Sequence, residues 1–399
     1  MEKTPNSNRV TISIFGNRNA GKSSILNSIA NQEVSIVSDI KGTTTDPVKK
    51  AMELIPAGPV LFIDTAGIDD EGELGSLRIK KSLEILRRTD IALFVMDASD
   101  IDTLSLERLE NEARYYEIPL LKVINKTDLL DEVKLSELKA EYPDAIFIST
   151  KKEEDIESLK EAIISLVKSV DEEKPLVSDI LKPDSNVILV IPIDKLAPKG
   201  RLILPQVQTL RDLLDHGIKS FVVRNTELES ALNDINKVDL VITDSQAFKE
   251  VDRIVPKGIP LTSFSILFAR QKGELLEFAK GVRAIDKLKK DSKVLIAENC
   301  THNTNHEDIG RKKIPNLIRQ KLGFDVQFDF KSGFDFEDSL SDYDLIIHCG
   351  GCMVNKREIL SRIRLAKEVN VPMTNYGMTI AYLNGILDRS IEIFKGSEV

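Results

Sequence analysis

The sequence has no tryptophan, only three cysteines and no long apolar run. An odd number of cysteines cannot pair off completely as disulfides, and a cytosolic setting would keep them reduced. The longest apolar runs, such as residues 187–193, are far too short to cross a bilayer. The net charge of -9 and the pI near 5.3 argue against a general nucleic-acid binder. The first ten residues lack the apolar core of a signal peptide, so we expect a cytoplasmic protein that binds neither membrane nor nucleic acid.

The three cysteines lie in two short pieces, Cys300-Thr301-His302 and His348-Cys349-Gly350-Gly351-Cys352. Each piece follows an apolar, β-like run, so both are expected at strand ends, where ligands gather in parallel α/β sheets. The two glycines let the backbone turn so that both neighbouring sulfurs face one metal centre. Three thiolates fit an iron–sulfur cluster with one iron held by something else, and they also fit a zinc site of three cysteines and one histidine. A redox-active cysteine pair is a third possibility.

A phosphate-binding loop follows the first apolar strand, residues 10–15. The G-x4-G-K-S pattern stands between that strand and a helix expected to begin near Ser23. Glycines let successive backbone N–H groups wrap the β-phosphate, and the helix N-terminus adds its positive end. Lys22 is placed to reach the β- and γ-phosphates, and the Ser23 hydroxyl to bind magnesium. The loop consists of Gly16, Asn17, Arg18, Asn19, Ala20, Gly21, Lys22, Ser23 and Ser24.

Three further motifs, in this order and spacing, are highly specific for a GTPase. A strand ends in DxxG, which supplies Asp64 on the magnesium side and a γ-phosphate-sensing backbone at Gly67. Another strand ends in NKxD, whose Asp128 can accept the N1 hydrogen and the exocyclic amine of guanine. Residues 147–151 resemble the loop that covers the base. The other nucleotide-binding residues expected here are Thr65, Ala66, Asn125, Lys126, Ser149, Thr150 and Lys151.

These motifs resemble the TrmE–Era side of the translation-factor-like GTPases. Gly42, Thr43 and Thr44 look like that group's switch, with Thr44 placed to touch magnesium, and Thr45 stands where the group has arginine. Ile68 replaces the water-orienting glutamine of Ras-like enzymes. In the group, the position of Asn19 helps to hold a potassium ion, which can stabilise charge on the transferring phosphoryl group. The expected catalytic set is therefore Lys22, Thr44, Asp64 and Gly67, with slow magnesium-dependent hydrolysis that is faster in potassium than in sodium.

A chain of 399 residues is too long for one ordinary core, and its alternating strands and helices predict an α/β protein. We expect a P-loop GTPase domain with a parallel sheet over residues 1–170, and two smaller α/β domains over 171–270 and 271–399. The charged, proline-bearing residues 171–186 predict a linker, and residues 271–288 a bridge between the last two domains. The middle domain shows no nucleophile–base pair, which favours an interaction module, most simply a dimerisation domain. His216 is expected to end a helix there.

The combination of GTPase motifs with the C-terminal cysteines resembles one family, HydF, the GTPases of FeFe-hydrogenase maturation. The family signature is CxH, a gap of roughly fifty residues, and HCxxC. In this sequence it reads Cys300-x-His302, 45 residues, and His348-Cys349-x-x-Cys352. The GTPase motifs alone would not single the family out, but joined to the cysteine signature they do. The resemblance covers essentially the whole chain.

The resemblance implies a scaffold and carrier. Proteins of this family bind a 4Fe-4S cluster through the three cysteines and form dimers through the middle domain. They receive a diiron precursor made by two radical-SAM maturases and hand it to the apo-FeFe-hydrogenase. GTP hydrolysis tunes those partner interactions in the family. The residues of this chain that match the cluster ligands are Cys300, Cys349 and Cys352.

The group that completes the cluster is left open by the sequence. His302 and His348 belong to the family signature, and Glu298 lies two residues before Cys300. A carboxylate would be a weak and replaceable iron ligand. Either histidine could instead donate a hydrogen bond to a sulfur or to the backbone and so orient the site.

Two other functions compete with this interpretation. One is a GTPase of ribosome or tRNA handling with a structural zinc at the three cysteines, against which the acidic pI weighs. The other is a redox-sensing regulator in which Cys349 and Cys352 form a disulfide that controls GTP turnover. Metal analysis separates iron from zinc, and thiol counting with and without reductant tests the regulator.

Overall fold

The chain divides into two compact units, Met1–Glu173 and Lys174–Val399. The computed structural model describes residues 5–31, 38–40, 48–65, 81–170, 174–193, 202–298, 309–332, 336, 340–351 and 354–395. No helix within these ranges is long and apolar enough to cross a membrane.

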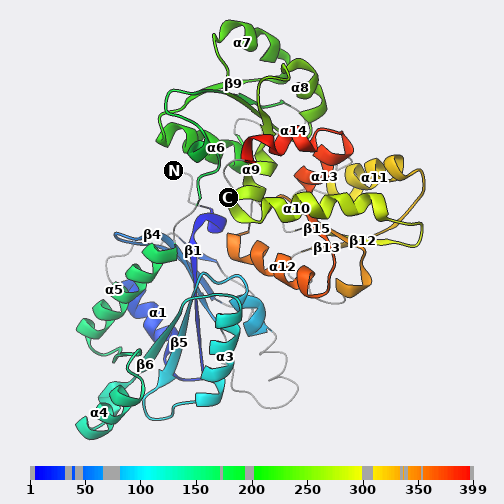
Figure 1. Ribbon diagram of the computed structural model, residues 1–399. Coiled ribbons are helices and arrows are strands. Elements are labelled where there is room, and N and C mark those ends of the chain that lie inside the picture. Colours follow the sequence, from blue (N-terminus) through cyan, green and yellow to red (C-terminus); the bar gives the residue numbers. More distant parts are fainter. Residues whose placement is uncertain are drawn as a thin grey trace. The chain divides into compact units, whose positions relative to one another are not determined.

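The first unit is a seven-stranded sheet in the order β2-β3-β4-β1-β5-β6-β7 (Figure 1). Strand β3 is antiparallel to both neighbours, and the other pairings are parallel. Strands β1 and β5 are buried on both faces, as expected for strands in the middle of a covered sheet. The strands are β1 (Val10–Gly16), β2 (Ser38–Ile40), β3 (Val48–Leu54), β4 (Gly58–Asp64), β5 (Ile91–Asp97), β6 (Leu120–Asn125) and β7 (Ile146–Phe147).

Helices cover both faces of this sheet, with a separate apolar core on each side. Side chains of α1 and α5 pack on one face, and those of α3 and of helical residues 81–86 pack on the other. Both P-loop and base motifs end parallel strands, so the sheet carries them to one edge. The helices are α1 (Lys22–Asn31), α3 (Thr103–Tyr115), α4 (Glu132–Glu141) and α5 (Glu153–Val170).

The second unit contains two four-stranded parallel sheets, in the orders β11-β10-β8-β9 and β13-β12-β14-β15. In Figure 1, α10 and α11 lie on one side of the second sheet and α12 lies on the other. The strands are β8 (Asn186–Val190), β9 (Lys219–Val223), β10 (Leu240–Thr243), β11 (Leu261–Ser263), β12 (Lys293–Glu298), β13 (Gln327–Ser332), β14 (Leu345–His348) and β15 (Met373–Asn375). The helices are α6 (Leu204–Asp215), α7 (Leu228–Asp234), α8 (Phe248–Ile254), α9 (Phe264–Lys272), α10 (Leu275–Gly281), α11 (Ile314–Leu322), α12 (Lys356–Glu368), α13 (Tyr376–Leu383) and α14 (Leu387–Ile391).

One apolar core runs through both sheets of this unit. Helix α9 packs on α6 as well as on α12 and α13, and α10 packs on β15. Residues 271–288, predicted to bridge two domains, are in fact part of this core, since Leu275, Phe278, Val282 and Ile285 are all buried. The α/β class with a P-loop sheet is confirmed, whereas the division into three domains stays a prediction.

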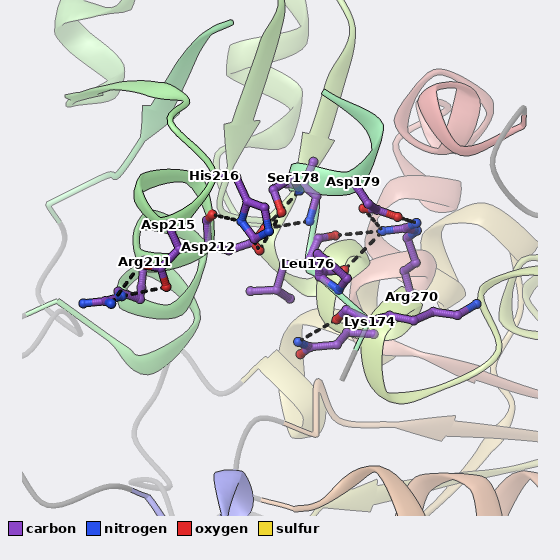
Figure 2. A network of polar contacts seen from close by, with 12 residues as sticks. Lys174, Leu176, Ser178, Asp179, Arg211, Asp212, Asp215, His216 and Arg270 are labelled. Atoms are coloured by element: carbon purple, nitrogen blue, oxygen red, sulfur yellow. Dashed lines mark hydrogen bonds and ion pairs between the residues drawn. The ribbon is translucent and has the colours of Figure 1, made fainter. Parts of the chain in front are cut away.

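The linker predicted over residues 171–186 is wrong for its described part. Residues 174–181 form a strap on the second unit, with Leu176, Val177 and Ser178 buried (Figure 2). Asp212 accepts hydrogen bonds from the backbone N–H groups of Val177 and Ser178 and from the Ser178 hydroxyl. Arg270 donates to the carbonyls of Pro175 and Leu176 and to Asp179. Its charged composition suggested a solvated segment, but these residues pair with specific partners.

Candidate functional site

The phosphate-binding loop leaves the C-terminal end of β1 with glycines that the geometry requires. Gly16 has φ +133°, and a Cβ there would lie 2.0 Å from the carbonyl oxygen of Val95. Gly21 has φ +97°, and a Cβ there would lie 2.2 Å from Asn125 Nδ2. Because no side chain intervenes, Asn125 reaches the loop and donates to the carbonyl of Ala20 at 2.9 Å. The phosphate loop and the base motif are thus fastened together.

The charged groups around this loop suit a nucleotide with its magnesium ion. Lys22 Nζ donates to the carbonyls of Gly16 and Asn17, at 2.7 Å each, on the loop that would surround a phosphate. The Ser23 hydroxyl donates to Asp64 Oδ2 at 2.6 Å, so the two predicted magnesium ligands on α1 and β4 are brought together. Asn19 is exposed in the left-handed region with φ +63°, and Arg18 and Ser24 are exposed as well.

The base motif lies at the ends of β6 and β7. Asp128 accepts from Ser149 Oγ and Lys151 Nζ, both at 2.6 Å, and these two bonds hold the pKa of the Asp128 carboxyl below its ordinary value. This carboxylate is therefore ionised at neutral pH, as an acceptor for two guanine N–H groups must be. Thr150 lies between the two donors, partly buried.

Two acidic residues support the nucleotide site, although no motif pointed to them. Asp97, at the end of β5, pairs with Lys126 at 2.6 Å. Burial raises the pKa of Asp97, but hydrogen bonds from Lys126 and Ser99 outweigh it and lower that pKa overall. Asp102 caps α3 and accepts from Asn17 Nδ2 at 2.9 Å, which ties the phosphate loop to that helix. The sequence offered one signal for each residue. Asp97 ends an apolar strand, and Asp102 stands directly before a helix.

Several predicted nucleotide and magnesium residues lie outside the described part of the chain. These are Gly42, Thr43, Thr44, Ala66 and Gly67. Thr65, by contrast, is buried, and both its hydroxyl and its N–H donate to the carbonyl of Ile14.

The cysteine site begins at the carboxyl edge of the second sheet of the second unit. Strands β12 and β14 are parallel neighbours, with Ala297 opposite His348. The N–H of Cys349 donates to the carbonyl of Ala297 at 2.9 Å, and Cys349 is buried. Cys300 follows Ala297 by three residues, so the chain leaves toward Cys300 from the strand end beside Cys349. Cys300, His302 and Cys352 lie outside the described residues.

One of the two glycines between Cys349 and Cys352 has a left-handed backbone conformation, while the turn that would bring both sulfurs to one metal centre stays a prediction. Gly351 has φ +67°, and its N-terminal neighbour Gly350 has no positive φ. A Cβ at Gly351 would also lie 2.5 Å from Ile359 Cδ1. The described part of the cysteine site is therefore one buried sulfur, that of Cys349, followed by the positive φ of Gly351. Among the described residues, no group of three or more His, Cys, Asp and Glu side chains is arranged to hold a metal ion.

Two of the candidate fourth ligands are already engaged by neighbouring groups. Glu298 accepts from Tyr376 Oη at 3.1 Å and pairs with Arg311 at 3.3 Å. His348 is buried, with Nδ1 at 2.6 Å from the Cys349 carbonyl and Nε2 at 2.9 Å from Arg362 Nη1. Arg362, on α12, was not singled out by the sequence, because a single arginine within a helix carries no motif. His216 ends α6 as predicted, and its Nδ1 contacts the Asp212 carbonyl at 2.8 Å.

Three models of known families match successive parts of the chain. Residues 176–273 match the description "Hydrogen maturase F dimerization domain", and residues 276–393 match "Hydrogen maturase F tetramerization domain". Residues 11–126 match "50S ribosome-binding GTPase". The two hydrogen maturase F matches together span more than half of the chain.

Individual relatives match about a third to two fifths of this chain. The tRNA modification GTPase MnmE of Flavobacterium psychrophilum is 34% identical over 167 residues, which is 40% of this chain and 36% of that protein. The same enzyme of Bacteroides thetaiotaomicron is 36% identical over 168 residues, with 40% and 36% covered. GTPase Der of Nitratiruptor is 36% identical over 131 residues, with 32% and 28% covered. The chain thus spans about a third of the length of the curated relatives it matches.

Two solved structures are similar to this chain at low sequence identity. A crystal structure of Era with MgGDPNP and 16S ribosomal RNA is 20% identical, with a TM-score of 0.32, and covers 54% of this chain and 92% of that one. The G domain of the FeoB iron transporter of T. maritima is 20% identical, with a TM-score of 0.31, and covers 40% of this chain and 98% of that one.

Proposed function

This chain belongs to the hydrogen maturase F family and is a GTPase of hydrogenase maturation, and from this premise we propose how it works. We propose that it is a scaffold and carrier that binds a 4Fe-4S cluster through Cys300, Cys349 and Cys352 and delivers a diiron precursor to the apo-FeFe-hydrogenase. The observation that carries the proposal is the buried Cys349, directly after β14, which pairs with β12, the strand that precedes Cys300 in the sequence.

The residues of the cysteine site have separate tasks in this proposal. The three thiolates hold the cluster, and the iron without a cysteine supplies a position for an exchangeable ligand. Cys349 is held by its N–H bond to Ala297, and Gly351 has the left-handed backbone conformation that glycine adopts without strain. Burial around Cys349 keeps water from the thiolate side of the site.

The nucleotide site binds GTP with Mg²⁺ and turns it over. Lys22 lies beside the loop that takes the phosphates, while Ser23 and Asp64, with Thr44 and Gly67, complete the magnesium and γ-phosphate side. Potassium at Asn19 is proposed to stabilise the charge that develops during hydrolysis. We propose that the nucleotide state adjusts affinity for the radical-SAM maturases and the hydrogenase, and that it does no chemistry on the diiron unit.

Dimerisation is proposed to use the outer edge of the middle sheet. Strand β9 ends the order β11-β10-β8-β9, and its Phe221 and Val222 are 37% and 48% exposed. Val207 and Leu214 on α6, which packs on β9, are exposed as well. An exposed apolar edge strand invites pairing with another strand, here that of a second copy. The expected cytoplasmic location stays a prediction.

Anaerobic reconstitution with iron and sulfide tests the cluster. We expect about four irons per chain, with a reduced-state EPR signal, and loss of both in Cys300→Ser, Cys349→Ser and Cys352→Ser. His216→Gln is the matched control, because it removes an imidazole at a helix end outside the signature, and it should leave the iron content unchanged.

Other outcomes point to the alternatives. Tightly held zinc with no reconstitutable iron would reject the scaffold in favour of a structural zinc site. A Cys349–Cys352 disulfide that changes GTP turnover, in a chain that takes up no iron, would favour the redox regulator. The matches of residues 176–393 to hydrogen maturase F domains give no support to a role in ribosome or tRNA handling.

A further inference from the structure

A buried arginine stands behind the cysteine-bearing segment. The side chain of Arg362, on α12, is 5% exposed, although a guanidinium is costly to bury. It pairs with Glu358 one turn earlier at 2.7 Å, and Glu358 is 12% exposed. Arg362 also lies over the ring of Phe336, 4.9 Å from its centroid. Burial lowers the pKa of Arg362, and the nearby Glu358 and Cys349 oppose that shift.

The hydrogen bond between Arg362 and His348 can have only one donor, the arginine. A guanidinium can donate but cannot accept, so His348 Nε2, at 2.9 Å from Arg362 Nη1, is the acceptor and carries no hydrogen. The other ring nitrogen then carries the hydrogen and donates to the Cys349 carbonyl at 2.6 Å. Both nitrogens of His348 are therefore used within the protein.

This arrangement differs from that of an iron-bound histidine in one respect. A metal-ligating histidine usually donates through one ring nitrogen to a carbonyl or carboxylate and gives its other lone pair to the metal. His348 makes the first of these contacts, but a cation occupies the lone pair that iron would need.

A second cation contacts the other end of the cysteine-bearing segment. Lys272, the last residue of α9, is 3% exposed and donates to the carbonyl of Val354 at 3.0 Å. Val354 comes two residues after Cys352. Positive charge from two different helices thus meets the segment that supplies two of the three thiolates.

We propose that Arg362 is a positioning residue of the cysteine site, which holds His348 as a hydrogen-bonding partner of the Cys349 backbone and keeps it from binding iron. This inference rests on the proposed function. It leaves His348 out of the competition for the fourth iron position, which stays available for an exchangeable ligand. The fixed charge of Arg362 also favours the more negative, reduced form of a cluster held by Cys349.

The test uses the full-length chain, reconstituted with iron and sulfide, and two spectroscopic readouts. His348→Gln should leave the nitrogen hyperfine couplings of the reduced cluster as they are in the wild-type chain. Arg362→Gln should shift the midpoint potential to more negative values, by about a tenfold change in the ratio of reduced to oxidised cluster, or ~59 mV for one electron. Glu358→Gln should shift it in the opposite direction, and Arg362→Lys should lie between wild type and Arg362→Gln.

The matched control is Lys367→Gln, which removes a cation of the same helix that is 50% exposed and pairs with Glu274. It should leave the potential unchanged. Loss of an imidazole coupling in His348→Gln would overturn the proposal, as would equal potentials in wild type, Arg362→Gln and Glu358→Gln. Equal shifts of one sign in the two variants would indicate a structural role only. A wild-type chain that takes up no iron would overturn the proposed function itself, which is a separate result.

Discussion

At the scale of single residues, the nucleotide loop depends on backbone conformations that few side chains adopt. Gly16 and Gly21 are required both by positive φ and by the atoms that a Cβ would meet. Asn19 also has positive φ, which asparagine tolerates better than most residues. Two reasons could thus explain an asparagine at position 19: the left-handed backbone conformation, and the side-chain amide that would hold potassium.

Asn19→Gly separates these two causes, because glycine keeps the left-handed backbone without strain and deletes only the amide. We expect wild-type GTP hydrolysis to be faster in potassium chloride than in sodium chloride, and the variant to have the same low rate in both. The measurement is the steady-state rate of phosphate release at equal ionic strength.

Ser24→Gly is the control for this prediction, since it changes another exposed residue of the phosphate-binding motif, in the first turn of α1. It should keep the preference for potassium. Equal wild-type rates in the two salts would remove the potassium proposal, and a variant that still prefers potassium would move the ion away from Asn19.

At the scale of elements, sequence patterns located motifs better than they located the residues that contact those motifs. Residues 356–368 form α12, whose asparagine cap and apolar spacing are signals local in the sequence. The strand that leads into NKxD ends at Asn125, the first residue of that motif. The short β11 carries no such signal, since three-residue strands have little periodicity.

Long-range contacts explain the rest of what the sequence could not provide. Arg362 reaches His348 across 14 residues, and Lys272 reaches Val354 across 82. Charged residues of helices usually face solvent, so the burial of these two cations depends on how their helices pack in the fold. The residues predicted from motifs are those whose chemistry depends on near neighbours in the chain.

The edge strand β9 gives a prediction for the oligomer. Val222→Lys places a charge on the exposed edge of the middle sheet, which opposes pairing with a second copy. We expect the dimer to weaken by at least about tenfold, with the GTPase rate per chain unchanged. Light scattering coupled to size exclusion measures the mass as a function of concentration.

Val133→Lys is the control, because Val133 is an exposed valine on α4 of the first unit. It should leave the dimer intact. A Val222→Lys chain with the wild-type mass at all concentrations would place the dimer contact elsewhere.

At the scale of the whole molecule, contacts between α14 and the segment around α8 help to hold the second unit together. Arg389, on α14, donates to the Asp252 carboxylate at 2.5 Å and to the carbonyls of Val255, Pro256 and Ile259. These carbonyls follow α8, where helical hydrogen bonds end and acceptors need other donors. Helix α14 thus packs against the middle sheet, in agreement with the single apolar core of this unit.

Arg389→Met should therefore destabilise the second unit by about 3 kcal/mol, because it leaves a largely buried carboxylate without its main partner. Lys257→Met is the control: this lysine contacts the same carboxylate but is 74% exposed, so its loss should cost less than about 1 kcal/mol. Urea unfolding followed by far-UV circular dichroism measures both. Equal losses of unfolding free energy in the two variants would show that the burial of Arg389 does not make it a stronger partner of Asp252 than Lys257.

The same pair predicts a dependence on pH. Burial raises the pKa of Asp252, but hydrogen bonds from Arg389 and Lys257 outweigh it, so that this pKa lies below its ordinary value of 3.8. A lowered pKa in the folded state stabilises the fold above the unfolded pKa, and this contribution is lost as the pH falls through the folded pKa. The difference in unfolding free energy between wild type and Arg389→Met should thus be constant near neutral pH and shrink only below about pH 4. A difference that already shrinks between pH 7 and 5 would assign the stabilisation to a group other than Asp252.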